Sequence, residues 1–262
     1  MNLLLLHFVI ALWVTALSAF LLGIFVYFRN RKNITNITFC LYSLSITWWS
    51  FCQIWLIACD KRLTALIWTR IEQVGVFFIP TFFVHFVISF LKIKNKGWLI
   101  RLGYLLSMFF AFLCPTRFMM ADAIPKLYVK YFATPGFAYH FAILFFIIYI
   151  AYGLRELFKE YFNSHGSRRN QLQYLCWSSL IGYIGGGANF LLVYGINIPI
   201  LNPFGTYALP LYVIVTAYAV IKYRLLEIEI AIQRIGIFLI TQIFVFGIPT
   251  LMIFFEIGRA HV

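Results

Sequence analysis

The sequence predicts an all-α integral membrane protein with a seven-helix transmembrane bundle followed by an eighth span. Of the 262 residues, 63% are hydrophobic and only 11% are charged, whereas a soluble domain typically carries about 25% charged residues. Eight apolar runs approach the ~20 residues that a helix needs to cross a bilayer. Basic residues gather in alternate loops between these runs. Composition, run length and charge placement therefore all indicate a multi-pass protein whose main partner is the lipid bilayer.

The eight predicted spans follow the apolar runs in order. They are Leu3–Phe28, Thr35–Cys59, Val74–Leu91, Trp98–Cys114, Gly136–Leu154, Leu172–Tyr194, Ile200–Ile221 and Ile235–Phe255. The third run can begin earlier, near Ala65. The first run has no basic residue before it and is too long for the apolar part of a cleaved signal peptide. We therefore expect it to be the first transmembrane helix.

The loop charges predict that the N-terminus lies outside the cell. With that orientation the inner loops hold 14 cations, which are Arg29, Arg31, Lys32, Lys92, Lys94, Lys96, Arg101, Arg155, Lys159, Arg168, Arg169, Lys222, Arg224 and Arg234. The outer loops hold only 5, which are Lys61, Arg62, Arg117, Lys126 and Lys130. Cytoplasmic loops carry an excess of Lys and Arg, so this orientation is the expected one.

The same distribution explains the net charge of +13 without a nucleic-acid partner. The cations form short clusters between apolar runs, which is typical of orientation in a bilayer. The longest outer loop, Thr116–Pro135, is too short to bury a core of its own. A stimulus or substrate is therefore expected to bind within the bundle or at its outer rim, and the inner loops are too short for a catalytic domain.

No motif predicts catalysis, a metal site or a cofactor. The five cysteines show no zinc-binding spacing. Cys59 and Cys114 both lie near outer helix ends, so either a disulfide or two packed thiols fits the sequence, and packing is favoured. His85 and His140 lie within spans. An ionisable residue there can mark a site, but we expect neutral imidazoles hydrogen-bonded inside the bundle.

Two spans contain polar residues that need partners. In the second, Asn36, Ser43, Thr47 and Ser50 are spaced along one helical face. Such a stripe either joins helices through hydrogen bonds or lines a polar pathway, and the first interpretation is favoured. In the third, "WTRIEQVG" places Arg70 and Glu72 near the outer boundary. They are two residues apart and project from different faces, so each is expected either to have a partner elsewhere or to extend to the lipid headgroups.

The sixth span and its outer end are the other candidate region. Gly182 and Gly186 form a small-xxx-small pair that allows a neighbouring helix to approach closely. Beyond them, polar residues reach the outer mouth of the bundle. They either line a pocket or cap helix ends and turns. We take the candidate ligand-binding residues to be Arg70, Glu72, Asn189, Tyr194, Asn197 and Asn202.

The last third of the chain resembles a known family. "RRNQLQYLCWSSLIGYIGGGANFLLVYGINIPILNPFGTYALPLYVIVTAYAVIKYRLLEIEI" (Arg168–Ile230) is similar to the end of the N-terminal seven-helix region of membrane sensor histidine kinases. The shared features are a basic-Gln-Tyr-Leu start, a Gly-rich sixth helix followed by Asn-Phe-Leu, a Tyr-Gly turn and a Lys-Tyr-Arg-Leu exit. The third span also resembles its family counterpart. Leu192 stands where the family often has Pro, which changes the outer mouth.

This resemblance implies a sensory input module of a two-component system. It also implies a dimeric parent kinase that phosphorylates itself and then a response regulator. His165 lacks the surroundings of a phosphoacceptor, and no ATP-binding motif is present. The residues expected to connect the bundle to the kinase region are Lys222, Tyr223, Arg224 and Leu225. A small-molecule transporter or channel is the alternative, and a membrane scaffold is a third class that no feature excludes.

The sequence predicts four consecutive segments. Residues 1–221 form the seven-helix region, and residues 222–234 form an interfacial linker on the inner side. Residues 235–255 form the eighth span, which would place the following residues outside. The last seven residues, "EIGRAHV", end an apolar run abruptly, and one back-translation of them contains the start of a widely used sequencing adapter. We therefore expect Glu256–Val262 to be a read-through artefact and the native chain to continue from about Phe255 into a return span and a kinase region.

Overall fold

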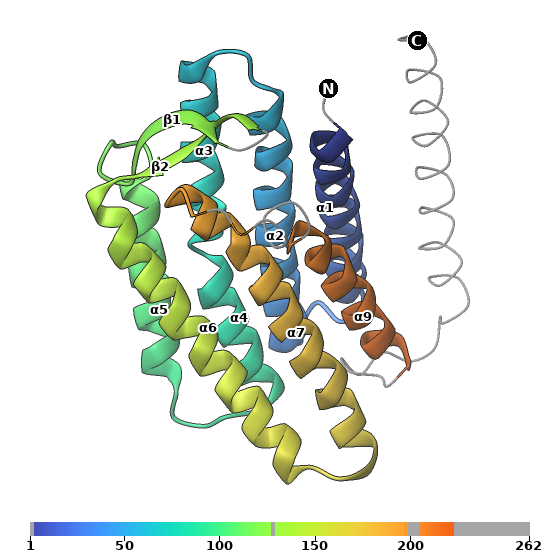
Figure 1. Ribbon diagram of the computed structural model, residues 1–262. Helices are drawn as coiled ribbons and strands as arrows, with labels where there is room; N and C mark the ends of the chain where they lie inside the picture. The colour runs from blue at the N-terminus through green and yellow to red at the C-terminus, as the bar shows by residue number, and fades with distance from the viewer. Residues whose placement is uncertain (1–2, 127–128, 197, 199–204, 223–262) are drawn as a thin grey trace, which may run out of the picture. The chain divides into compact units, whose positions relative to one another are not determined.

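The computed structural model describes residues 3–126, 129–196, 198 and 205–222. They form helices joined by short loops, with one β-hairpin (Figure 1). The elements are α1 (Leu3–Arg29), α2 (Ile34–Ala58), α3 (Arg62–Val76), α4 (Ile79–Phe90), α5 (Gly97–Leu113), β1 (Met120–Lys126), β2 (Val129–Pro135), α6 (Phe137–Asn163), α7 (Gly166–Val193), the 3-10 turn η1 (Gly205–Tyr207) and α9 (Ala208–Lys222).

The helices confirm the predicted seven-helix membrane bundle. Among the described residues, five helical segments are long and apolar enough to cross a bilayer, with α3 and α4 counted as one segment, Arg62–Phe90. Two shorter apolar helices, Gly97–Leu113 and Gly205–Ala219, complete seven in the described part of the chain. The linker from Tyr223 onward, the eighth span at 235–255 and the tail at 256–262 lie outside the described residues.

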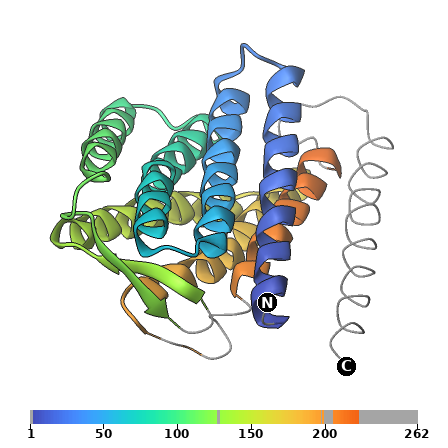
Figure 2. The same cartoon turned by 90° about the horizontal axis from the view of Figure 1, so that it is seen from above.

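The helices pack in a closed ring. α1 contacts α2, α2 contacts α4, α4 contacts α6, α6 contacts α7, α7 contacts α9, and α9 contacts α1 again. Figure 2 shows α1 between α2 and α9. α5 packs on α3, α4 and α6 and turns large apolar side chains outward, with Leu105 66% and Phe112 83% exposed. Such a surface suits contact with lipid.

The third span bends where α3 ends and α4 begins. Phe77 and Phe78 interrupt the helix just before Pro80, which lies in the first turn of α4. Proline removes a backbone donor and is a common cause of helix kinks. The carbonyl of Phe77 is satisfied by the Ser107 hydroxyl of α5 at 2.7 Å, and Thr81 bonds the same hydroxyl at 2.7 Å. The bend is therefore stabilised by a neighbouring helix.

Two members of the polar stripe on α2, Asn36 and Thr47, join this helix to α1 as the favoured interpretation predicted, whereas the buried Ser50 hydroxyl has no partner among the described residues. The Asn36 side-chain amide donates to the Val26 carbonyl at 3.2 Å. The Thr47 hydroxyl lies 3.4 Å from the Ala16 carbonyl. Opposite Ser43, α1 has Gly23, where an added Cβ would lie only 2.7 Å from the Ser43 Cβ. Small residues here allow the backbones to approach closely.

The observed bounds differ from the sequence-based ones in several places, including α7, which begins at Gly166 rather than Leu172. The third span starts at Arg62, close to the earlier start near Ala65 that the sequence allowed, because α3 is amphipathic. α6 continues nine residues past Leu154. The loop Thr116–Pro135 contains the hairpin β1–β2, an antiparallel pair in which Ala123 faces Ala133. All five cysteines are free, so Cys59 and Cys114 are not bridged.

The two ends of the bundle have different characters. The hairpin lies with the first turns of α3 and α6 and the last turn of α7, and we call this the hairpin end (Figure 1). At the other end lie the α1–α2, α4–α5 and α6–α7 loops and the last turn of α9. This end carries the predicted inner cations up to Lys222, and we call it the basic end.

Candidate functional site

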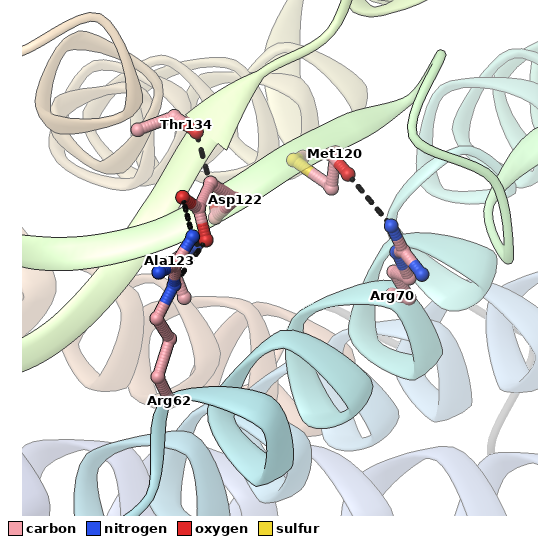
Figure 3. A network of polar contacts seen from close by, with 6 residues as sticks. All are labelled: Arg62, Arg70, Met120, Asp122, Ala123 and Thr134. Atoms are coloured by element: carbon pink, nitrogen blue, oxygen red, sulfur yellow. Dashed lines mark hydrogen bonds and ion pairs between the residues drawn. The ribbon is translucent and has the colours of Figure 1, made fainter.

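Two arginines of α3 hydrogen-bond to the hairpin (Figure 3). Arg62 makes a bidentate pair with Asp122, with its Nε 2.7 Å from Oδ1 and its Nη2 bonded to Oδ2. The hydrogen bond from Arg62 lowers the pKa of the Asp122 carboxyl. Arg70 donates from Nη2 to the Met120 carbonyl at 3.2 Å. Thr134 on β2 donates to the Asp122 carbonyl at 3.1 Å, which ties the second strand to the same point.

Lys126, the last residue of β1, hydrogen-bonds to the end of α7. Its ammonium donates to the carbonyls of Ala133, Leu192 and Val193 at 2.7, 3.1 and 2.5 Å. The last carbonyls of a helix lack intrahelical partners and favour a cation. Burial lowers the pKa of the Lys126 ammonium to about 8. The hairpin is therefore hydrogen-bonded to both α3 and α7.

The end of α7 itself is a glycine cap. Gly195 has φ +76, in the left-handed region that glycine adopts without strain. The amides of Gly195 and Ile196 donate back to the carbonyls of Leu192 and Leu191 at 2.9 and 3.0 Å. Leu192 thus accepts from both the cap and Lys126, which couples the position of the hairpin to the last turn of α7.

Arg70 and Glu72 have separate surroundings, as predicted. Arg70 reaches the hairpin, whereas Glu72 is only 4% exposed and points into the bundle. With the Gln53 amide oriented so that its nitrogen faces the carboxylate, this nitrogen lies 2.8 Å from both oxygens of Glu72. Gln53 is itself 1% exposed. The two buried side chains join α3 to α2 by a polar contact inside the bundle.

Of the other predicted mouth residues, Asn189 and Tyr194 can be placed. Asn189 donates to the Gly186 carbonyl at 3.2 Å and lines a cavity between the helices. The Tyr194 hydroxyl lies 2.9 Å from His140 Nδ1 on α6. His85 bonds Tyr104 at 3.0 Å in a partly buried position, as predicted, whereas His140 is exposed and makes its hydrogen bond at the surface rather than inside the bundle. Asn197 and Asn202 lie outside the described residues.

The structure thus separates the four described members of the predicted set into four places: Arg70 contacts the hairpin, Glu72 contacts Gln53, Asn189 lines the cavity, and Tyr194 lies at the end of α7 beside His140. Of the predicted signal linker, Lys222 is the last helical residue of α9. Tyr223, Arg224 and Leu225 lie outside the described residues.

The helix that leads to this linker is packed tightly on α7. A Cβ on Gly185 would overlap the Gly205 carbonyl and the Ala208 Cβ, and one on Gly182 would lie 3.0 Å from the Tyr212 Cβ. Ser178 and Thr216 bond at 3.2 Å further along the same contact. The predicted glycine pair does meet a neighbouring helix. Gly185, which the sequence analysis did not select, makes the closest approach.

Several of these residues were missed because no local pattern marks them. The acceptors of Lys126 on α7 are 66 and 67 residues away, and Arg62 and Asp122 are 60 apart. The sequence shows the positive charge of Lys126 between two spans but not its partners. Within the described residues, no group of three or more His, Cys, Asp or Glu is placed to hold a metal ion.

One comparison with known proteins gives the family. The family model described as the N-terminal 7TM region of histidine kinase matches residues 11–229. No curated protein matches the chain. The match covers every helix described above except the first turns of α1. It also agrees with the seven apolar helical segments and with the resemblance of Arg168–Ile230. The chain belongs to the N-terminal seven-transmembrane regions of histidine kinases, and it is a membrane-embedded sensory input module.

Proposed function

We propose that this module receives its stimulus in the outer half of the bundle, at the hairpin end, and passes it through α7 and α9 to a cytoplasmic kinase region. The observation that carries this proposal is the Lys126 bridge. A single ammonium connects the hairpin to the last turn of α7, and α7 is packed through glycines against α9, which ends at Lys222.

Tight packing makes such a path effective. Close-packed helix interfaces do not deform continuously, so a small shift at one end favours one of a few discrete arrangements. A stimulus that binds one arrangement more strongly than another changes their populations. Couplings of about 1–3 kcal/mol are typical. In this proposal the α7–α9 contact is the element with discrete arrangements. The hairpin acts on α7 at one side of this contact, and α9 on the other side leads to Lys222.

The six residues chosen from the sequence test the location of the stimulus site. In a complete histidine kinase that carries this region, with a transcriptional reporter, we expect alanine at some of these positions to reduce the response to the stimulus. The positions are Arg70, Glu72, Asn189, Tyr194, Asn197 and Asn202. Immunoblots of membrane fractions control for expression. A response of wild-type strength in all six variants would place the stimulus site elsewhere.

We also propose that the hairpin end faces outward, together with the N-terminus. The charge difference between the two ends supports this orientation. With single cysteines introduced into a cysteine-free background, an impermeant thiol reagent added to intact cells is expected to label Ala121→Cys on the hairpin. Ser164→Cys at the basic end is expected to react only after permeabilisation. The reverse pattern would overturn the orientation.

By the family relationship we further propose that the parent kinase is a homodimer and that a response regulator meets only its kinase region. Disulfide or chemical cross-linking in native membranes measures the first part. A kinase that signals while remaining monomeric would contradict it.

A further inference from the structure

A cavity lies between the helices that carry the signal in the proposed function. Its volume is about 70 Å³, and a single water requires roughly 10–15 Å³. Side chains from α2, α6, α7 and α9 line it, together with Val76 of α3 and Ile79 of α4. We call it the interhelical cavity. It is partly enclosed and has room for more than one water.

The cavity walls are apolar and aromatic. Tyr42, Phe146, Tyr183 and Tyr212 contribute rings, with Tyr42 and Tyr212 edge to face at 6.3 Å and Phe146 and Tyr183 edge to face at 6.4 Å. Gly186 lines another part without a side chain. Aromatic walls favour a further ring through stacked or edge-to-face contacts. Among the described residues, none of those lining the cavity is Asp, Glu, Lys, Arg or His, so a neutral ligand fits this site.

Ser179 supplies a polar group that lacks a partner. Its side chain is 1% exposed and lines the cavity, and among the described residues its hydroxyl has no hydrogen-bond partner. By contrast, the nearby Tyr183 hydroxyl donates to the Tyr42 hydroxyl at 2.9 Å. A buried hydroxyl without a partner is costly. A ligand with one hydrogen-bonding group would satisfy it once the Ser179 side chain turns toward the cavity, since its Oγ is fully buried in the structure, whereas a lipid acyl chain would not.

We propose that the interhelical cavity binds a small, neutral, lipid-soluble molecule with one aromatic ring and one hydroxyl or carbonyl group, which hydrogen-bonds to Ser179 Oγ. The ring packs among the aromatic walls, and any remaining part of the molecule extends through the open side. Because Leu209 and Tyr212 of α9 line the cavity opposite α7, an occupant contacts both helices. Only its effect on signalling rests on the proposed function.

The binding test uses the full 262-residue chain in phosphatidylcholine nanodiscs and two ¹⁹F NMR probes. 4-Fluorophenol carries a hydroxyl, and fluorobenzene is the matched probe without it. Both are titrated against wild type, Ser179→Ala and Gly186→Leu. Ser179→Ala removes the hydroxyl without adding volume, and Gly186→Leu fills the cavity from a position where an added Cβ makes ordinary contact at 3.4 Å.

We expect saturable binding of 4-fluorophenol to wild type and affinity about 5–10-fold weaker in Ser179→Ala, because one hydrogen bond is lost. Fluorobenzene should bind both proteins equally, and neither probe should bind Gly186→Leu saturably. Absence of saturable 4-fluorophenol binding to wild type, or equal affinity in wild type and Ser179→Ala, would overturn the proposal. If Gly186→Leu does not fold, the Ser179→Ala comparison still decides. Since no kinase output is measured, a failure here is separate from a failure of the signal path.

Discussion

Gly185→Ala is expected to lower the free energy of unfolding by about 1–3 kcal/mol. The new methyl group would overlap the Gly205 carbonyl and the Ala208 Cβ, so backbone has to move rather than a flexible side-chain end. This cost outweighs the roughly 0.5–1 kcal/mol that alanine gains over glycine within a helix. Unfolding of the purified protein by SDS in mixed micelles measures the difference.

Gly187→Ala is the matched control for this substitution. It lies two residues further along α7, and an added Cβ meets nothing within 4 Å. The helix-propensity gain then acts alone, and we expect the stability to rise by up to about 1 kcal/mol. Opposite signs for the two alanines would show that the α7–α9 contact limits the packing. Equal effects would contradict the tight contact at Gly185.

Glu72→Leu is expected to destabilise the bundle by about 1–3 kcal/mol. The substitution leaves the Gln53 side chain without its carboxylate partner, at a position only 1% exposed. Glu72→Gln keeps a hydrogen-bonding group of the same length and should retain most of the stability. The same unfolding measurement applies, with far-UV circular dichroism to show that the helices form.

The double substitution Glu72→Leu with Gln53→Leu gives the decisive control. Replacing both polar partners by apolar groups removes the unsatisfied Gln53 group, whereas Trp49, which also hydrogen-bonds to Glu72, still lacks its acceptor, so the double variant should recover part of the stability lost in Glu72→Leu. The single variant Gln53→Leu is measured alongside. If the double variant loses as much stability as the two single variants lose in sum, the buried pair does not carry the interaction between α2 and α3.

The sequence could predict the spans because a bilayer imposes a length and a composition on every helix that crosses it. It left the start of the third span open between Ala65 and Val74, since α3, which begins at Arg62, mixes Thr69, Glu72 and Gln73 with apolar residues. Hydropathy does not distinguish a polar residue that faces the bundle interior from one that faces water. The stripe on α2 was predictable because residues at helical spacing share one face.

The candidate site was predictable only in part. That Arg70 and Glu72 point to different partners follows from their spacing. That these partners are Met120 and Gln53 depends on how distant segments meet. The same limit applies to the hairpin, which is held by Arg62 and Lys126 through contacts more than 50 residues apart in sequence. The unpaired hydroxyl of Ser179 appears only when its surroundings are known.

The central claim is that the α7–α9 contact transmits a change at the hairpin end. Ser178 and Thr216, whose hydroxyls lie 3.2 Å apart, provide a site for a reversible lock. In a complete, otherwise cysteine-free kinase that carries this region, Ser178→Cys with Thr216→Cys can be oxidised to join the helices. Lys126→Met then serves as a perturbation at the hairpin end, because it removes the three bonds to the Ala133, Leu192 and Val193 carbonyls.

The deciding measurement is autophosphorylation of this kinase in membrane vesicles, with and without Lys126→Met and before and after reduction by dithiothreitol. We expect Lys126→Met to change the rate when the lock is reduced and to have no effect when it is oxidised. Disulfide formation is quantified on non-reducing gels in the same samples. An equal effect of Lys126→Met in the fully oxidised and the reduced kinase would show that the signal does not pass through the α7–α9 contact.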